Sequence, residues 1–286
     1  MTLLLALASA VLYGAADFTG GLATRRASTL PVIVLSQLSG LVLLALLFPF
    51  LPAATPSRAD LLWGVTAGLT GGAGVALLYR ALAIGRMAVV APTTAVCAVA
   101  VPVLVSVALG ERPGPLAVAG IVLGLVAIVL VSQQTAPEPA ALAPEGGARL
   151  PPGVGIALVS GVAIGLFLLS LAQTRVEAGM WPILASRSTS VGLFGLAALF
   201  TRRSLRLPGV LLLTLVGGVM DMTANALYLL AVQVGPLSVV VTLASLYPAS
   251  TVLLARVMLG ERLNLRQVAG VACALAAIAL IVGGGR

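Results

Sequence analysis

The chain has 286 residues, of which 60% are hydrophobic and only 8% are charged, and its mean hydropathy is +1.17. These values exclude a soluble globular domain and indicate a chain embedded in a membrane. All 16 basic residues are arginines, and the net charge of +8 is better explained by arginines in loops facing anionic lipid headgroups than by a nucleic-acid partner.

Ten apolar segments are long enough to cross a bilayer. A helix that spans about 30 Å of hydrocarbon needs about 20 apolar residues. Glycine, proline and charged residues separate such segments, and the expected spans are residues 3–22, 30–51, 61–84, 87–109, 115–131, 153–172, 181–200, 209–232, 237–259 and 265–282. The first span lacks a basic leading region and contains Asp17, so we expect it to be retained rather than removed as a signal peptide.

A stretch rich in proline and alanine separates the fifth span from the sixth. It has no room for a span, and its composition is typical of a linker outside the membrane. The sequence therefore predicts a first five-helix unit at residues 1–132, a linker at 133–151 and a second five-helix unit at 152–286.

The two units repeat one another at an offset of 150 residues. At this offset the LGER at 109–112 falls on the LGER at 259–262, Arg25 falls on Arg175, and Gln37 falls on Arg187. Apolar segments often match one another by chance, but a charged tetrapeptide in register with arginines is strong evidence for a repeat. Because each unit has an odd number of helices, the second must enter the membrane from the opposite face. We expect an all-α membrane protein of ten transmembrane helices, built as an inverted repeat, with a cavity between its halves and the two LGER segments on opposite sides.

These features resemble the drug/metabolite transporter superfamily, and specifically its ten-helix EamA type. The likeness rests on two five-helix units in which the fourth helix ends in LGER and the fifth opens with VAG. Its most specific piece is SLYPASTVLLARVMLGER at 245–262, with APTTAVCAVAVPVLVSVALGER at 91–112 as the counterpart. The resemblance implies export or exchange of small metabolites such as amino acids. It assigns no role to Asp17, because the first helix varies across the family.

The segment DMTANALY contains the strongest candidate binding residues. Asp221, Asn225 and Tyr228 are spaced to share one face of an otherwise apolar helix. A charge at the bilayer centre costs about 2.5 to 3.5 kcal/mol, so this face should look inward. Asp221 either binds a substrate amine or a proton, or forms a structural salt bridge for which Arg187 is the candidate partner.

Arg187, Tyr79 and Asp17 each have two interpretations. Arg187 occupies the repeat position of Gln37, which indicates a buried hydrogen-bonding spot of either structural or substrate-binding use. Tyr79 and Tyr228 are repeat counterparts after a one-residue slip, and either line one cavity or anchor the helices at the membrane interface. Asp17 lies four residues after Tyr13 near the expected end of the first helix, and is either an interfacial anchor or part of a site.

Ser245 and Tyr247 stand beside Pro248 in the ninth expected span. A proline inside a transmembrane helix frees a carbonyl one turn earlier, and such irregular backbone is tolerated where it borders a cavity. We therefore include Ser245 and Tyr247 among the candidate substrate-binding residues.

The sequence contains no histidine, no nucleophile beside a base, no phosphate-binding loop and no metal-ligand spacing, so we expect no enzyme, no cofactor and no metal site. Cys97 and Cys273 lie in apolar runs and are expected to be small core residues. Without a nucleotide-binding motif, an ion or solute gradient is the expected energy source, with protons bound at Asp221 as a candidate coupling ion.

The expected partners are a small-molecule substrate and the lipid bilayer, for a monomer or homodimer that passes several times through the cytoplasmic (inner cell) membrane. A zwitterion such as an amino acid would suit Asp221 together with Arg187, and the aromatic content of 4% favours it over a lipophilic cation. The alternatives are efflux of drugs or other cationic compounds, and a receptor or assembly protein on the same scaffold that transports nothing. Loop arginines favour termini outside the cell, whereas the family resemblance favours termini inside.

Overall fold

The computed structural model of the chain describes residues 1–108, 114–132, 151–202, 204–234, 240, 243–244 and 246–284. The described residues form helices and no strand. The long helices are α1 (Thr2–Arg26), α2 (Thr29–Leu47), α3 (Arg58–Ile84), α4 (Met87–Ala108), α5 (Pro115–Ser132), α6 (Val154–Ala172), α7 (Trp181–Phe200), α8 (Leu211–Val234), α10 (Tyr247–Leu259) and α11 (Leu265–Gly284). Two short 3₁₀ helices, η1 (Phe48–Phe50) and η2 (Val176–Ala178), follow α2 and α6.

The helices follow the predicted spans closely. Six of them, α1, α2 with η1, α3, α6, α7 and α8, are long and apolar enough to cross a membrane. Four shorter apolar helices lie at Met87–Val101, Val118–Ala127, Tyr247–Leu259 and Leu265–Leu280. The first LGER, the linker up to residue 150 and most of the ninth span before α10 lie outside the described residues.

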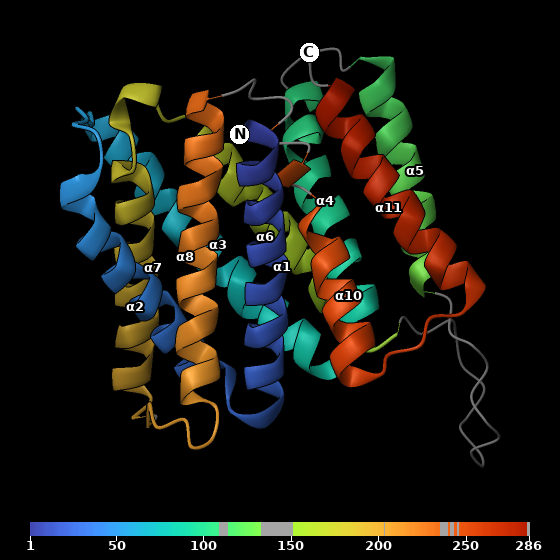
Figure 1. Cartoon of the computed structure of the whole chain (residues 1–286), viewed down its shortest axis with the longest axis horizontal. Coiled ribbons are helices and arrows are strands. Elements are labelled where there is room, and N and C mark those ends of the chain that lie inside the picture. The colour runs from blue at the N-terminus through green and yellow to red at the C-terminus, as the bar shows by residue number, and fades with distance from the viewer. Residues whose placement is uncertain are drawn as a thin grey trace.

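The helices stand side by side in one bundle (Figure 1). In that view α1 begins and α11 ends at the upper end. The connection from α1 to α2 lies at the lower end, whereas its counterpart from α6 to α7 lies at the upper end. Equivalent connections of the two halves therefore lie at opposite ends of the bundle.

Helix packing repeats between the halves. If α1 to α5 are matched in order with α6, α7, α8, α10 and α11, the contact of α1 with α8 has its counterpart in the contact of α6 with α3. The contact of α2 with α8 likewise corresponds to that of α7 with α3, and the contact of α4 with α6 to that of α10 with α1. Counterpart helices also meet directly, as α2 with α7, α4 with α10 and α5 with α11.

The most extensive contacts divide eight helices into two bodies. The α1 body consists of α1, α2, α8 and α10, and the α3 body consists of α3, α4, α6 and α7. Each body contains two helices from either half of the chain. The seam between the bodies is crossed by contacts of α1 with α3, α2 with α7 and α4 with α10, while α5 and α11 pack together beside α4.

Glycines at four-residue spacing allow α3 to approach α7 closely. A Cβ atom on Gly64 would lie 2.6 Å from the carbonyl oxygen of Pro182, and one on Gly68 would lie 2.5 Å from that of Ser186. Larger residues would force the helices apart. The two helices therefore form one tightly packed unit within the α3 body.

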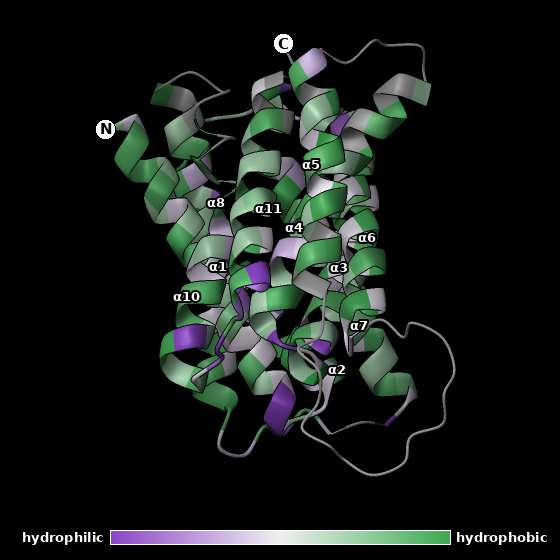
Figure 2. Ribbon diagram, turned by 90° about the vertical axis from the view of Figure 1, so that its right-hand side faces the viewer, coloured by the Kyte–Doolittle hydropathy of each residue, from purple (hydrophilic) through white to green (hydrophobic). Residues whose placement is uncertain are grey.

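The outside of the bundle is apolar. Leu212, Leu253 and Val257, on α8 and α10, expose 75%, 60% and 72% of their surface, and many other leucines and valines are similarly exposed. Figure 2 shows most of the length of the helices in green, the colour of hydrophobic residues. An apolar surface of this extent is suited to contact with lipid tails.

Candidate substrate-binding site

An ion pair between α7 and α8 lies at the centre of the candidate site. Arg187 on α7 pairs with the carboxylate of Asp221 on α8 and donates a second hydrogen bond to the side-chain oxygen of Gln37 on α2. These bonds cross the seam, because α7 belongs to the α3 body whereas α2 and α8 belong to the α1 body. The side chains of Arg187 and Asp221 keep 13% and 25% of their accessible surface, so other side chains cover the pair only in part.

The helix face predicted in α8 is formed. The side-chain amide of Asn225 donates a hydrogen bond to the backbone carbonyl of Asp221 at 2.7 Å. Tyr228 is partly buried and packs against a small apolar cluster that includes Ala6 of α1 and Ala231 of α8. The face therefore runs from the ion pair toward α1, and the pairing of Asp221 with Arg187 is one of the two interpretations that the sequence left open.

Asp17 belongs to the same group of residues. It lies well within α1, which continues to Arg26, and it interacts electrostatically with Asp221 and Tyr247. Within the described part of the chain, no residue forms a hydrogen bond or an ion pair with the Asp17 carboxylate. This placement favours a role in the site over an interfacial anchor.

Three of the four tyrosines of the chain interact electrostatically with these charges, and Tyr228 interacts with one of the three, Tyr13. Tyr13 interacts electrostatically with Asp221, Arg187 and Tyr228, and its ring centroid lies 6.4 Å from that of Tyr247 in an edge-to-face arrangement. Tyr79 is 3% exposed, its ring covers Gly20 of α1, and its hydroxyl lies beside that of Ser36. Tyr79 is thus buried against α1, whereas Tyr228 is partly buried near the start of α1 and the end of α8, and a cavity-lining role of this pair stays a prediction.

The sequence-based interpretation of Pro248 is wrong. Pro248 lies in the first turn of α10, which begins at Tyr247 after a turn at Leu246, and so it starts a helix rather than interrupting one. At this position the missing N–H leaves no carbonyl without a partner, because the first turn of a helix has no intrahelical acceptor for it. Ser245 lies outside the described residues.

The second LGER joins parts of both bodies at the lower end of the bundle. Gly260 adopts φ +66°, a left-handed conformation that ends α10 and directs Glu261 toward the start of α4. The Glu261 carboxylate accepts hydrogen bonds from the backbone N–H groups of Met87 and Ala88 at 3.1 and 3.0 Å. It also pairs with Arg25 at 3.3 Å. Glu261 therefore caps a helix that belongs to the other half of the chain.

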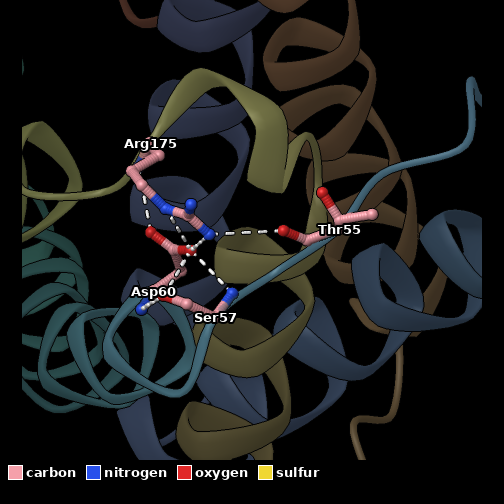
Figure 3. A network of polar contacts seen from close by, with 4 residues as sticks. All are labelled: Thr55, Ser57, Asp60 and Arg175. Atoms are coloured by element: carbon pink, nitrogen blue, oxygen red, sulfur yellow. Dashed lines mark hydrogen bonds and ion pairs between the residues drawn. The ribbon is translucent and has the colours of Figure 1, made fainter.

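A second network lies at the other end, around the start of α3 (Figure 3). Asp60 and Ser57 form a capping box, and Arg175 approaches Asp60 with its backbone N–H at 3.0 Å and its guanidinium at 2.9 Å. The guanidinium also donates to the carbonyl oxygen of Thr55 at 3.4 Å. The hydrogen bond with Asp60 raises the pKa of Arg175 above its ordinary value. Sequence reasoning missed this network, although the S-x-x-D spacing of Ser57 and Asp60 is a known helix-start signal.

The described residues contain no group of three or more histidine, cysteine or acidic side chains that could hold a metal ion. Within the same ranges Cys97 and Cys273 are free thiols, both partly buried. Among its described residues the seam holds the guanidinium of Arg187, the carboxylates of Asp17 and Asp221, side-chain amides and tyrosine hydroxyls.

Comparison with known proteins gives one family match. The model of the EamA-like transporter family matches residues 1–133 and again residues 151–283. No curated protein matches the chain significantly. Among 11 matching chains of known structure, one protein known by its crystal structure has a TM-score of 0.60 at 17% identity, covering 96% of this chain and 95% of its own. At that identity the likeness concerns the fold.

Proposed function

The chain belongs to the EamA-like transporter family, and from this premise we propose that it is a secondary transporter that exports or exchanges small metabolites, such as amino acids, across the cytoplasmic membrane. Membership of this family makes it a multi-pass membrane transporter rather than an enzyme. The substrate class, the direction of transport and the transport mechanism are our proposals.

One observation carries the proposal. Arg187 and Asp221 lie deep in an apolar bundle, at the seam between the two bodies, and still retain accessible surface. Intramembrane charges are costly unless they are paired or border a water-filled space, and they are typical of substrate and ion pathways. A partly accessible ion pair surrounded by tyrosines is therefore suited to polar ligands.

Alternating access through an inverted repeat is the mechanism that we propose. Two features support it: the repeated packing of the halves, and the opposite ends at which their equivalent connections lie. In such transporters one body rocks against the other around a fixed site near the midplane. Here the fixed site would be the group of polar residues that crosses the seam.

Charge balance within the site bears on the substrate. A zwitterion would place its carboxylate on Arg187 and its amine on a carboxylate. Because Asp221 is already paired with Arg187, Asp17 is the carboxylate left for the amine. We assign the substrate amine, or a coupling proton that takes its place, to Asp17 in preference to Asp221.

The balance of charges in the site also favours a second candidate function, the export of cationic compounds. Arg187 offsets one of two carboxylates, which leaves the site with one unbalanced negative charge when both are ionised. Tyr13 and Tyr247, whose rings lie close to each other and whose hydroxyls interact with the carboxylates, provide the aromatic surroundings that cations favour. A singly charged amine suits this site as well as a zwitterion does.

Counterflow in proteoliposomes tests these proposals. The purified protein is reconstituted, the vesicles are loaded with an unlabelled compound, and uptake of the labelled compound is followed for a panel of amino acids and organic amines. We expect accelerated exchange of at least one member of the panel, lost in the variant Asp17→Asn. No exchange above protein-free vesicles for any compound would favour a scaffold that does not transport.

A further inference from the structure

The lower end of the bundle is closed by contacts between the two bodies. Arg25 ends α1, which belongs to the α1 body, and it donates to the carbonyl oxygens of Leu82 and Gly85 at the end of α3 at 3.3 and 3.0 Å. Glu261 follows α10, also of the α1 body, and accepts from the first turn of α4 in the α3 body. The same few atoms thus hold α1 and α10 against α3 and α4.

Arg86 strengthens this closure from the other side. It lies between α3 and α4, and its guanidinium donates to the side-chain oxygen of Gln267 at 3.1 Å and to the backbone carbonyl of Arg262. Both acceptors follow α10 in the chain. The α3 body is therefore bound by the start of the connection from α10 to α11 and by the first turn of α11, with Glu261 making the most contacts.

The Asp60 network at the upper end differs from the Glu261 network, because it lies within one body. Asp60 starts α3 and Arg175 follows α6, so both belong to the α3 body. Close contacts of Gly64 and Gly68 with α7 already fix these helices to one another. The Asp60 network therefore stabilises one body internally, whereas the Glu261 network joins two bodies.

We propose that Glu261 is a releasable latch that holds the α1 and α3 bodies together at the lower end of the bundle, and that its release opens the seam at that end. The Glu261 carboxylate accepts charge-assisted bonds from the N–H groups of Met87 and Ala88 across the seam and from Arg25 within the α1 body, so removing it frees the start of α4 and leaves Arg25 only its carbonyl acceptors on α3. The Arg25 side chain is 27% exposed, so water can replace its bonds to the carbonyl oxygens of Leu82 and Gly85 when the bodies separate.

The latch also gives the repeated tetrapeptide a physical role. Leu259 packs against the main apolar cluster, Gly260 supplies the left-handed turn, Glu261 caps α4, and the carbonyl of Arg262 accepts from Arg86. Each position of the second LGER is thus used at the contact between the bodies.

Distances between spin labels test the latch without any substrate. In a background in which Cys97 and Cys273 are replaced by alanine, labels are attached to cysteines that replace Ile84 and Val257. These two positions are exposed at the lower end, on α3 and α10, one in each body. A second pair at Leu62 and Val234, on α3 and α8, reports on the upper end.

Glu261→Ala should shift the lower-end distances to longer values, and Arg25→Met, which removes two other bonds across the seam, should shift them in the same direction. Asp60→Asn is the matched control, since it removes an ion pair within one body, and it should leave the lower-end distances unchanged. If Glu261→Ala does not fold, the lower-end distances in Arg25→Met test the latch in its place. Lower-end distances that stay at wild-type values in both variants, or that move equally in Asp60→Asn, would overturn the latch. Because no transport is measured, this result is separate from the proposed function.

Discussion

Arg187 on α7 donates a hydrogen bond to Gln37 on α2, and these two residues lie 150 positions apart, which is the offset at which the halves of the chain repeat. A residue that contacts its own repeat counterpart lies beside the axis that relates the halves. The polar site is therefore built at that axis. It is nevertheless unsymmetrical, because the counterpart of Asp221 is Gly71 and the ion pair belongs to the second half alone.

The proposed inverted arrangement can be tested with two single cysteines. Arg26 and Val176 are repeat counterparts, both are exposed, and they lie at opposite ends of the bundle. We expect a membrane-impermeant maleimide to label only one of the variants Arg26→Cys and Val176→Cys in intact cells, and the other after permeabilisation. The background lacks Cys97 and Cys273. Labelling of both from one side would rule the inverted arrangement out, and the variant labelled first identifies the outer face.

Breaking the central ion pair should destabilise the protein. Arg187→Met leaves Asp221 without its partner inside the bundle, at a cost of up to about 3 kcal/mol in the free energy of unfolding. The double variant Arg187→Met with Asp221→Asn should recover most of this loss, since no uncompensated charge remains. Thermal unfolding in detergent measures both. The matched control is Arg80→Met, because Arg80 is exposed on α3, and a loss there as large as that of Arg187→Met would contradict the explanation.

Removing the charge of Asp17, in contrast, should not destabilise the protein. Because its carboxylate lies near Asp221 and has no bonded partner in the described ranges, Asp17→Asn removes repulsion and should leave the unfolding temperature equal or higher. The same change should weaken binding of amines by about tenfold or more, which is about 1.4 kcal/mol. Ligand-induced shifts in unfolding temperature measure this binding. Glu177→Gln, at an exposed carboxylate in η2, is the control and should alter neither quantity.

Helix positions could be predicted from the sequence, because apolar length reports on them directly, and the pairing of Asp221 with Arg187 could be named as one of two alternatives. The lone carboxylate of Asp17 and the capping role of Glu261 could not. Both depend on which helices meet across the seam, and apolar helices of similar composition give no signal for their neighbours. The repeat of LGER indicated that the tetrapeptide has a fixed role, but only the contact with Met87 and Ala88 explains that role.

Close packing of α3 on α7 gives a prediction with an internal control. A Cβ atom on Gly68 would meet the carbonyl oxygen of Ser186 at 2.5 Å and the Cβ of Thr189 at 2.7 Å, neither of which can move without shifting α7. Gly68→Ala should therefore lower the free energy of unfolding by about 1 to 3 kcal/mol. Gly192→Ala on α7 makes the same change where no atom lies within 4 Å, and it should be neutral or stabilise by up to about 1 kcal/mol. Because the two helices belong to one body, Gly68→Ala should also leave the lower-end label distances in place, and a shift there would mean that α3 and α7 do not move as a unit.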